Sequence, residues 1–193
     1  MSDGVTINPS SPYPSPEIDS VRMLTVAGKS VEVELRRHFM QLDTRGNSMG
    51  WPRKHIWHKI SSATLLGRVT KDSATVAITN PIFNMKLYGG VVTPKRTRTL
   101  AIPNTAAAYS AGSPREGVAP SSLKVLKFRK SGALALAEVS GKAITVWYWL
   151  VKRATIKADP EALPSMEELE SKVGRTVDAF VQRQLARSSW GVA

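Results

Sequence analysis

Residues 86–103 read KLYGGVVTPKRTRTLAIP, and the rest of the chain is organised around this stretch. The pattern predicts two short β-strands, over 86–93 and 99–102, joined by a turn. Gly89-Gly90 interrupts the first strand, which indicates either a bulge or a place where another backbone approaches closely. A hairpin is therefore expected at the centre of the fold.

The expected turn is basic. Pro94 opens it and Pro103 ends the second strand, because proline cannot donate a hydrogen bond to a ladder. Every charged side chain between the two prolines is positive. Together with cations of the neighbouring segments, the turn is expected to face an interface or an anion. The candidate residues are Lys86, Lys95, Arg96, Arg98, Arg115, Lys124, Lys127, Arg129 and Lys130.

Positive charge is concentrated in the middle of the chain. The whole sequence has 27 Lys and Arg against 15 Asp and Glu, a net charge of +12. Residues 45–130 hold 15 of the cations and only two acids, Asp72 and Glu116, so this section alone carries +13. Such a field favours an anionic partner, either nucleic acid or an acidic protein surface. The alternative is a solvated basic face that serves solubility.

The length of 193 residues suits one domain with tails, and we expect a single α+β domain over 17–187. Cysteine is absent, which excludes a disulfide framework, a thiolate metal site and a cysteine nucleophile. No run approaches the roughly 18 apolar residues of a membrane span, and the N-terminus lacks the apolar core of a signal peptide. We therefore expect synthesis in the cytoplasm, neither export nor a membrane anchor, and no cofactor.

The N-terminal region is expected to be an arm followed by a helix. Residues 1–16 carry four prolines with serines between them, which favours an extended arm. This arm is either a disordered terminus or a segment that reaches a neighbouring subunit. Ser15-Pro16-Glu17 is a good helix start, and apolar residues follow at helical spacing to about residue 43. Alternatives for the later part are a break near Gly28 and a strand over 31–35.

A second, shorter helix is expected over 51–62, beginning at Trp51-Pro52. His55 and His58 lie three residues apart in it, but no suitable third ligand is close in the sequence, so a metal site is not expected. The tryptophans Trp51 and Trp57 are instead expected to pack on the sheet.

The middle of the chain predicts further antiparallel hairpins. Strands over 65–70 and 74–79 flank a turn at 71–73, and strands over 123–129 and 133–139 flank another at 130–132. Residues 104–122 are rich in Ala, Ser, Gly and Pro. They are expected to form a long loop that either serves an interface or is mobile.

The strongest strand is expected over 143–154, which reads AITVWYWLVKRA. Both of its faces are apolar, and this indicates a central strand covered on both sides. A barrel or a sandwich would provide such cover. Helices on one face and a neighbouring subunit on the other would serve equally.

A C-terminal helix is expected after a short linker at 159–164. Ser165 and Glu168 form a capping box, and Arg183 and Arg187 close the helix in agreement with its dipole. Residues 188–193 are expected to be a tail. The predicted fold is therefore α+β, a mostly antiparallel sheet of hairpins with an N-terminal and a C-terminal helix packed on it.

The sequence contains no recognisable catalytic constellation. Walker, GxGxxG, GxSxG and HExxH motifs are absent, and no carboxylate pair lies in an apolar run. The aromatic residues are not interleaved with the basic turns, which argues against a surface for stacking single-stranded bases. We therefore expect a protein that is not an enzyme.

Several short motifs, taken in their order, resemble a known family. They are Gly50-Trp51-Pro52, Tyr88-Gly89-Gly90-Val91-Val92-Thr93-Pro94, Leu100-Ala101-Ile102-Pro103, Ala107-Ala108-Tyr109 with Ser113-Pro114-Arg115, and Leu150-Val151-Lys152-Arg153 leading into residues 158–164. Over about residues 17–187, this order is similar to that of the tail-completion proteins of tailed bacteriophages, the minor tail protein Z and virion morphogenesis group.

The resemblance implies a structural virion protein of the tail or neck, with no active site. It would form a homo-oligomeric, six-fold ring at the head-proximal end of the tail and mediate head–tail joining. Its neighbours would be tail terminator, head-completion or portal-adaptor proteins, and its basic turn would face an acidic neighbour or DNA in the channel. The alternative function is a basic nucleic-acid-binding protein whose hairpins contact phosphates.

Overall fold

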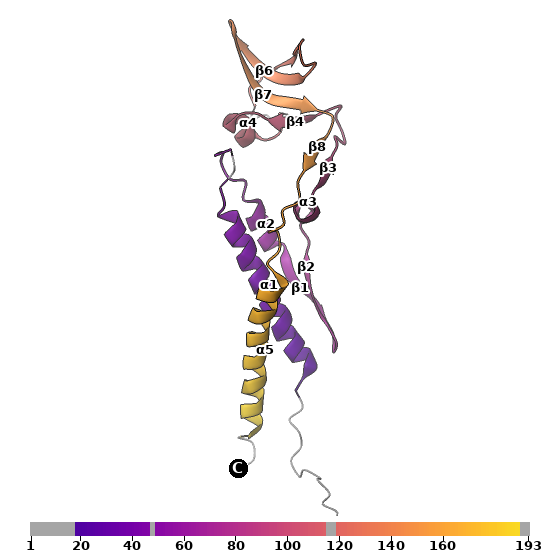
Figure 1. Cartoon of the computed structure of the whole chain (residues 1–193), viewed down its shortest axis with the longest axis vertical. Coiled ribbons are helices and arrows are strands. Elements are labelled where there is room, and N and C mark those ends of the chain that lie inside the picture. Colours follow the sequence, from indigo (N-terminus) through magenta and orange to yellow (C-terminus); the bar gives the residue numbers. More distant parts are fainter. Residues whose placement is uncertain (1–17, 47–48, 115–118, 190–193) are drawn as a thin grey trace, which may run out of the picture. The chain divides into compact units, whose positions relative to one another are not determined.

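The computed structural model describes residues 18–46, 49–114 and 119–189 (Figure 1). The expected arm over 1–16 lies outside the described residues. Helices and antiparallel strands together confirm the predicted α+β class. In chain order the elements are α1 (Ser20–Asp43), α2 (Ile56–Ser62), β1 (Thr64–Val69), β2 (Ala74–Ile78), α3 (Pro81–Tyr88), β3 (Gly90–Val92), β4 (Leu100–Pro103), α4 (Ala106–Ala111), β5 (Lys124–Lys127), β6 (Leu134–Ser140), β7 (Ala143–Val151), β8 (Ala154–Ile156) and α5 (Met166–Ser189).

The chain divides into two compact units. The helical unit contains α1 up to Glu34, residues Leu66–Ala77 and the chain from Ser165 onward. The sheet unit contains Leu35–Leu65 and Ile78–Pro164. Because α1 and β1 each contribute residues to both units, the single domain expected over 17–187 stays a prediction.

In the helical unit, α1 packs closely on the β1–β2 hairpin at Gly28. A Cβ atom at this position would lie 2.5 Å from Cδ1 of Leu66 and 3.1 Å from Cβ of Ala74. The glycine therefore allows the helix and the strand to approach closely. The helix α1 continues through Gly28, so neither the alternative of a break near Gly28 nor that of a strand over 31–35 is correct. The predicted turn between β1 and β2 is confirmed, since the Thr70 N–H donates to the Ser73 carbonyl at 2.8 Å.

The C-terminal helix α5 pairs with α1 in the same unit. The Ser30 hydroxyl donates to the Thr176 hydroxyl at 3.2 Å, and the Lys172 ammonium lies 2.7 Å from Glu168 and 3.2 Å from Glu34 of α1. Hydrogen bonds from Lys172, first to Glu168 and then to Glu34, raise the pKa of the ammonium. These contacts fix the register of α5 on α1.

The start of α5 agrees with the prediction, because the Glu168 N–H donates to the Ser165 hydroxyl at 3.2 Å. Its end does not. The helix extends to Ser189, so the first part of the tail expected over 188–193 is helical, and residues 190–193 lie outside the described part.

The hairpin predicted over 86–93 and 99–102 is wrong. Residues up to Tyr88 form α3 instead, because the Asn80 side chain accepts the Ile82 N–H at 2.9 Å and Pro81 occupies the first turn, where its missing donor costs nothing. The following strand β3 pairs with β8, and β4 pairs with β7, so the two expected partners belong to different sheets. The predicted close backbone approach at Gly89 is confirmed, since a Cβ there would lie 2.7 Å from the Ile156 carbonyl oxygen.

The main sheet of the sheet unit has the strand order β4-β7-β6-β5, with every neighbouring pair antiparallel. The predicted central strand is confirmed as β7, although it ends at Val151 and residues 154–156 leave to form β8. The predicted hairpin around residues 130–132 is confirmed as β5–β6. The register shifts between Leu136 and Ala137 of β6, which face Tyr148 and Val146 of β7, so Trp147 of β7 is the extra residue of a β-bulge.

Within this chain β7 is covered on one face, by a helix, so the expectation of cover on both faces stays a prediction that needs a neighbouring subunit. Only Tyr148 is fully buried, and its hydroxyl donates to the Ala108 carbonyl of α4 at 3.1 Å. This helix packs on β4 and β7, as Figure 1 also shows. Farther along the strand Ile144 is 54% exposed. A continuous apolar strand thus has one covered face and one that is partly open.

Residues 104–122 are not a loop throughout. Their early part forms α4, because the Thr105 hydroxyl accepts the Ala108 N–H at 3.1 Å and caps an alanine-rich turn. Residues 115–118 lie outside the described part. The sequence therefore contained a sign of this helix that the loop prediction ignored, a capping threonine followed by three alanines.

The second helix begins later than expected, at Ile56 instead of residue 51, because His55 has a left-handed backbone (φ 50°) that cannot continue a helix. The tryptophans do not pack on the sheet as predicted. Trp57 stacks on Phe39 of α1 with ring centroids 5.9 Å apart, and Trp51 lies against Tyr109 of α4 at 5.3 Å. Trp57 thus joins α2 to α1 at the fully buried Phe39, whereas Trp51, in the segment before α2, contacts α4.

Candidate functional site

Two strand ladders bring basic segments from three parts of the chain to one end of the main sheet. Val92 of β3 faces Ala154 of β8, and Leu100 of β4 faces Val151 of β7. The turn over 93–99 is therefore held at both of its ends beside residues 152–153. On β6, the next strand, Leu134 faces Leu150, which places the β5–β6 turn at the same end of the sheet.

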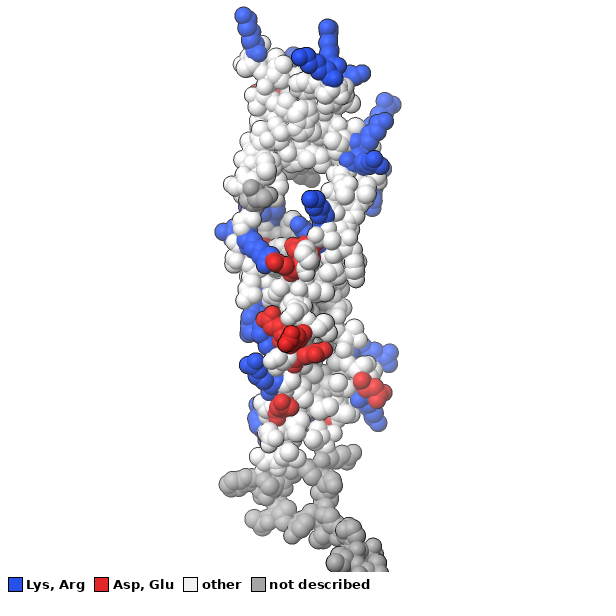
Figure 2. All heavy atoms as spheres, in the orientation of Figure 1, with Lys and Arg blue, Asp and Glu red and all other residues white. Residues whose placement is uncertain are grey.

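Eight exposed cations occupy these segments, and we call them the basic end. They are Lys95, Arg96 and Arg98 in the turn before β4, Lys152 and Arg153 after β7, and Lys127, Arg129 and Lys130 at the β5–β6 turn. Figure 2 shows Lys and Arg side chains projecting from this part of the molecule with little acid between them.

The basic end is not neutralised within the described part of the chain. None of the ion pairs of the described residues involves its eight cations. The nearest acid along these strands is Glu138 of β6, four residues from Leu134, where it accepts a hydrogen bond from Ser122 at 3.3 Å. Uncompensated cations on neighbouring turns add their fields, so this surface attracts anions.

The structure brings together six of the nine predicted site residues. Lys86 is separate, because it lies in the last turn of α3 with its ammonium 5.9 Å from the centre of the Trp57 ring. Lys124 opens β5, three residues from Lys127 toward the other end of the sheet, and Arg115 lies outside the described residues. Sequence reasoning missed Lys152 and Arg153. In the sequence these two cations directly follow the strongest predicted strand. They could be assigned to the basic end only once β7 was known to lie beside β4.

Two aromatic rings lie near the basic end but contact each other. Phe128, in the β5–β6 turn, and Trp149 of β7 have centroids 5.6 Å apart. The Trp149 indole N–H also donates to the Asn104 side-chain oxygen at 2.9 Å. Both rings are half-buried, and their contact with each other leaves them less open to stacking with a base than free surface rings would be.

The open face of the main sheet carries exposed aliphatic side chains. Residues that face each other across antiparallel strands project to the same side, so Val139 and its partner Ile144 form a cross-strand pair. They are 43% and 54% exposed, and Ile102 of β4, which faces Trp149, is 37% exposed. Tyr148, next to Trp149, projects to the opposite side, where α4 covers it. We call Ile102, Val139 and Ile144 the apolar face.

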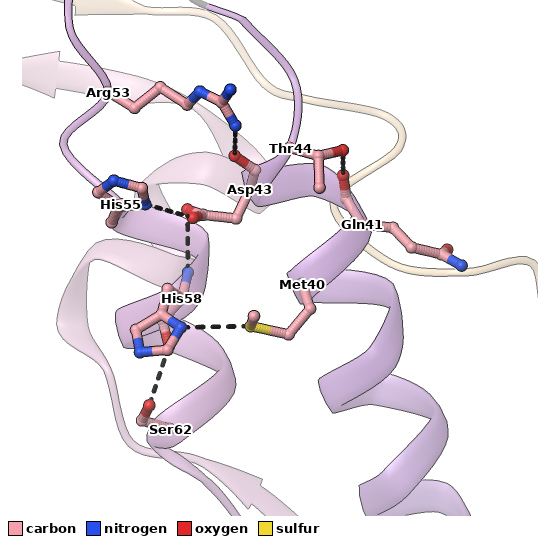
Figure 3. Close-up of polar contacts among 8 residues, drawn as sticks. All are labelled: Met40, Gln41, Asp43, Thr44, Arg53, His55, His58 and Ser62. Carbon is pink, nitrogen blue, oxygen red and sulfur yellow. Dashed lines mark hydrogen bonds and ion pairs between the residues drawn. The ribbon is translucent and has the colours of Figure 1, made fainter.

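A second polar cluster surrounds Asp43 at the end of α1 (Figure 3). One carboxylate oxygen lies 2.7 Å from Nδ1 of His55, and the other accepts the His58 N–H at 3.1 Å. Desolvation raises the pKa of Asp43, but the hydrogen bonds of His55 and His58, together with the charges of these rings, hold it below its usual value. The carboxylate therefore caps the start of α2 across the connection from α1.

This cluster has no catalytic partner among the described residues. No serine or threonine hydroxyl there bonds to His55, and Nδ1 of His58 lies 3.3 Å from the Met40 sulfur. Among the described residues, no group of three or more His, Asp or Glu side chains is placed so that it could hold a metal ion. The contacts that the structure shows for this cluster link the end of α1 to the start of α2.

Comparison with protein-family models, with curated proteins and with solved structures found no match. Among the helices that the structure describes, none is long and apolar enough to cross a membrane.

Proposed function

We propose that this chain is a structural subunit of a tailed-phage virion. It forms a homo-oligomeric ring at the head-proximal end of the tail and joins the finished tail to the filled head, without enzymatic activity. Its neighbours are tail terminator, head-completion or portal-adaptor proteins. The order of motifs along the sequence suggests this role, and the apolar face is the structural observation that supports it.

The motif residues that carry the resemblance have structural positions. Gly89 lies at the close approach of two backbone segments, the four residues from Leu100 to Pro103 form β4, and Trp51 packs on Tyr109 of α4. Residues with such roles are expected in a subunit that works by its shape. The proposal therefore rests on surfaces and assigns no reacting group.

The apolar face supports assembly through the face of the sheet. Val139 and Ile144 form a cross-strand pair and Ile102 lies farther along the same face; side chains that remain 37–54% exposed gain free energy when a partner covers them, roughly 1 kcal/mol for each side chain at this exposure. Extension of the sheet at its edges is less suited, because Pro103 ends β4 and Lys124 and Lys127 flank β5. Proline and lysine are the residues that discourage strand addition at an edge.

Electron microscopy of lysates from a phage that lacks the gene tests the role. Filled heads and complete tails that lie unattached would support head–tail joining. Normal infectious particles would refute the structural role, and missing or overlong tails would move the protein to tail-length termination.

Complementation separates the apolar face from a general loss of fold. Ile144→Glu with Val139→Thr should fail to restore joining and should lower the mass of the assembled protein in sedimentation. The control Val33→Glu changes a side chain of the helical unit with a similar exposure, 50%. Equal behaviour of the two variants would show that the apolar face is not the assembly surface.

A further inference from the structure

We propose that the basic end binds the phosphate backbones of double-stranded DNA without regard to base sequence. This inference goes beyond assembly and head–tail joining, because the purified protein would bind DNA in the absence of heads, tails and partner proteins. It rests on the position, the charge and the surroundings of the eight cations described above.

The basic end has two groups of cations. One group combines the turn over 95–98 with Lys152 and Arg153, beside β4 and β7. The other is Lys127, Arg129 and Lys130, at the turn that joins β5 to β6. Lys152 and Arg153 follow β7, which in the strand order β4-β7-β6-β5 is one to two strand spacings from the β5–β6 turn, about 5–10 Å at roughly 4.8 Å for each spacing. The turn over 95–98 leads into β4 and lies two to three spacings from the β5–β6 turn, about 10–14 Å.

This separation fits a duplex. The major groove of B-DNA is about 12 Å wide, so the turn over 95–98 and the β5–β6 turn can each contact one of the phosphate strands that border the groove, with Lys152 and Arg153 between them. An isolated basic turn would contact one strand only. The register of the sheet, and not the number of charges alone, therefore favours a double-stranded partner.

The surrounding side chains agree with duplex binding. Proteins that hold single strands use free aromatic faces for base stacking, and the two rings near this surface, Phe128 and Trp149, pack on each other. Base-specific readout relies largely on hydrogen bonds from a helix or a ribbon that enters the groove. The cations here lie on turns, where flexible lysine and arginine side chains suit phosphates at variable positions.

An acidic protein surface is the competing anion. Phosphate binding differs from it in one measurable respect, the release of condensed counterions, which makes the logarithm of the affinity fall linearly with the logarithm of the salt concentration. If about six of the eight cations contact phosphates, the slope is about −5, and the affinity falls about 1,000-fold between 50 and 200 mM salt.

The test measures binding of the full-length protein to a labelled 24-base-pair duplex, to a single strand of the same length and to poly-glutamate, each over a series of salt concentrations. The basic-end variant carries Arg96→Gln, Arg98→Gln, Lys152→Gln and Arg153→Gln. A control variant carries four substitutions of exposed cations in the helical unit, Arg68→Gln, Lys71→Gln, Arg175→Gln and Arg187→Gln. Both variants lose four positive charges, so net charge is matched.

We expect the wild-type protein to prefer the duplex and the basic-end variant to bind it about 100-fold or more weakly at 100 mM salt, with a slope lower by about 3 to 4. The control variant should keep most of its affinity and its slope. Circular dichroism and tryptophan fluorescence would check that both variants fold.

Three results would overturn the proposal. They are an equal loss of affinity in the two variants, tighter binding of the single strand than of the duplex, and tighter binding of poly-glutamate than of DNA. A failure of DNA binding would leave head–tail joining intact, because that role is tested by particles and by the apolar face.

Discussion

Replacement of Gly89 by alanine should destabilise the sheet unit far more than the same change at Gly132. Both glycines have a left-handed backbone, with φ of 68° and 67°. A new Cβ at Gly132 meets nothing within 4 Å, so this substitution adds backbone strain alone, about 1 kcal/mol.

At Gly89 the added Cβ would also collide with backbone. It would lie 2.7 Å from both the Ala158 nitrogen and the Ile156 carbonyl oxygen, and neither atom can rotate away as a side chain could. The backbone at Gly89 combines a positive φ of 68° with an extended ψ of −165°, a conformation that is used almost only by glycine. Strain of about 1–3 kcal/mol and overpacking of about 1–3 kcal/mol give an expected loss of about 2–6 kcal/mol.

Urea unfolding followed by tryptophan fluorescence measures this difference, because Trp51, Trp57, Trp147 and Trp149 all belong to the sheet unit. Gly141→Ala is a second control, with φ of 60° and nothing within 4 Å of the added atom. If Gly89→Ala lost no more stability than the two controls, the close contact between β3 and the chain after β8 would not exist as described.

Three further outcomes follow from the polar contacts of the sheet unit. Within the described residues the buried indole nitrogen of Trp147 has no hydrogen-bond partner, whereas that of Trp149 donates to the Asn104 side-chain oxygen at 2.9 Å. Replacement by phenylalanine removes the same atoms at both positions, so W149F should lose about 2 kcal/mol more stability than W147F in urea unfolding. An equal loss of stability would contradict the unpaired nitrogen of Trp147. The pKa of Asp43 is held below its usual value of about 3.9, so its ionised form stabilises the folded state above that pH, and this contribution is lost as the pH falls through the lower, folded-state pKa. Unfolding midpoints between pH 5 and pH 2 should therefore fall less steeply in D43N than in the wild-type protein, and parallel curves would contradict this linkage. Removal of the helix cap in Asn80→Ala should cost about 1 kcal/mol in thermal unfolding, and an unchanged midpoint would contradict capping of α3.

The sequence predicted elements whose signals are local. The capping serine and the acids that lead α5 specify its start, and the spacing of apolar residues predicted α1. Turn residues between alternating strands predicted the β1–β2 and β5–β6 hairpins, because strands next to each other in the chain pair through their own turn. The strand β7 was recognised as central from its apolar composition.

Errors arose where a long-range partner competed with a local pattern. The stretch before Gly89 resembles a strand, but Asn80 and Pro81 start a helix there, and β3 then pairs with β8, more than 60 residues later in the chain. The pattern of β7 contained no information on which face a helix would cover. The tryptophans likewise found helical ring partners that no local signal specifies.

The sequence by itself determined that the middle of the chain is strongly basic and that the protein mixes helices with antiparallel hairpins, and at Gly89 it left a choice between a bulge and a close approach of backbones. Charge, turn chemistry and helix capping act over a few residues, so they can be recognised without a fold. The tertiary structure alone decided that Lys152 and Arg153 join the turn over 95–98, because strand register brings together segments that are about 55 residues apart in the chain. It also decided which aliphatic side chains stay exposed, since exposure depends on what packs across a sheet and not on the order of residues along a strand.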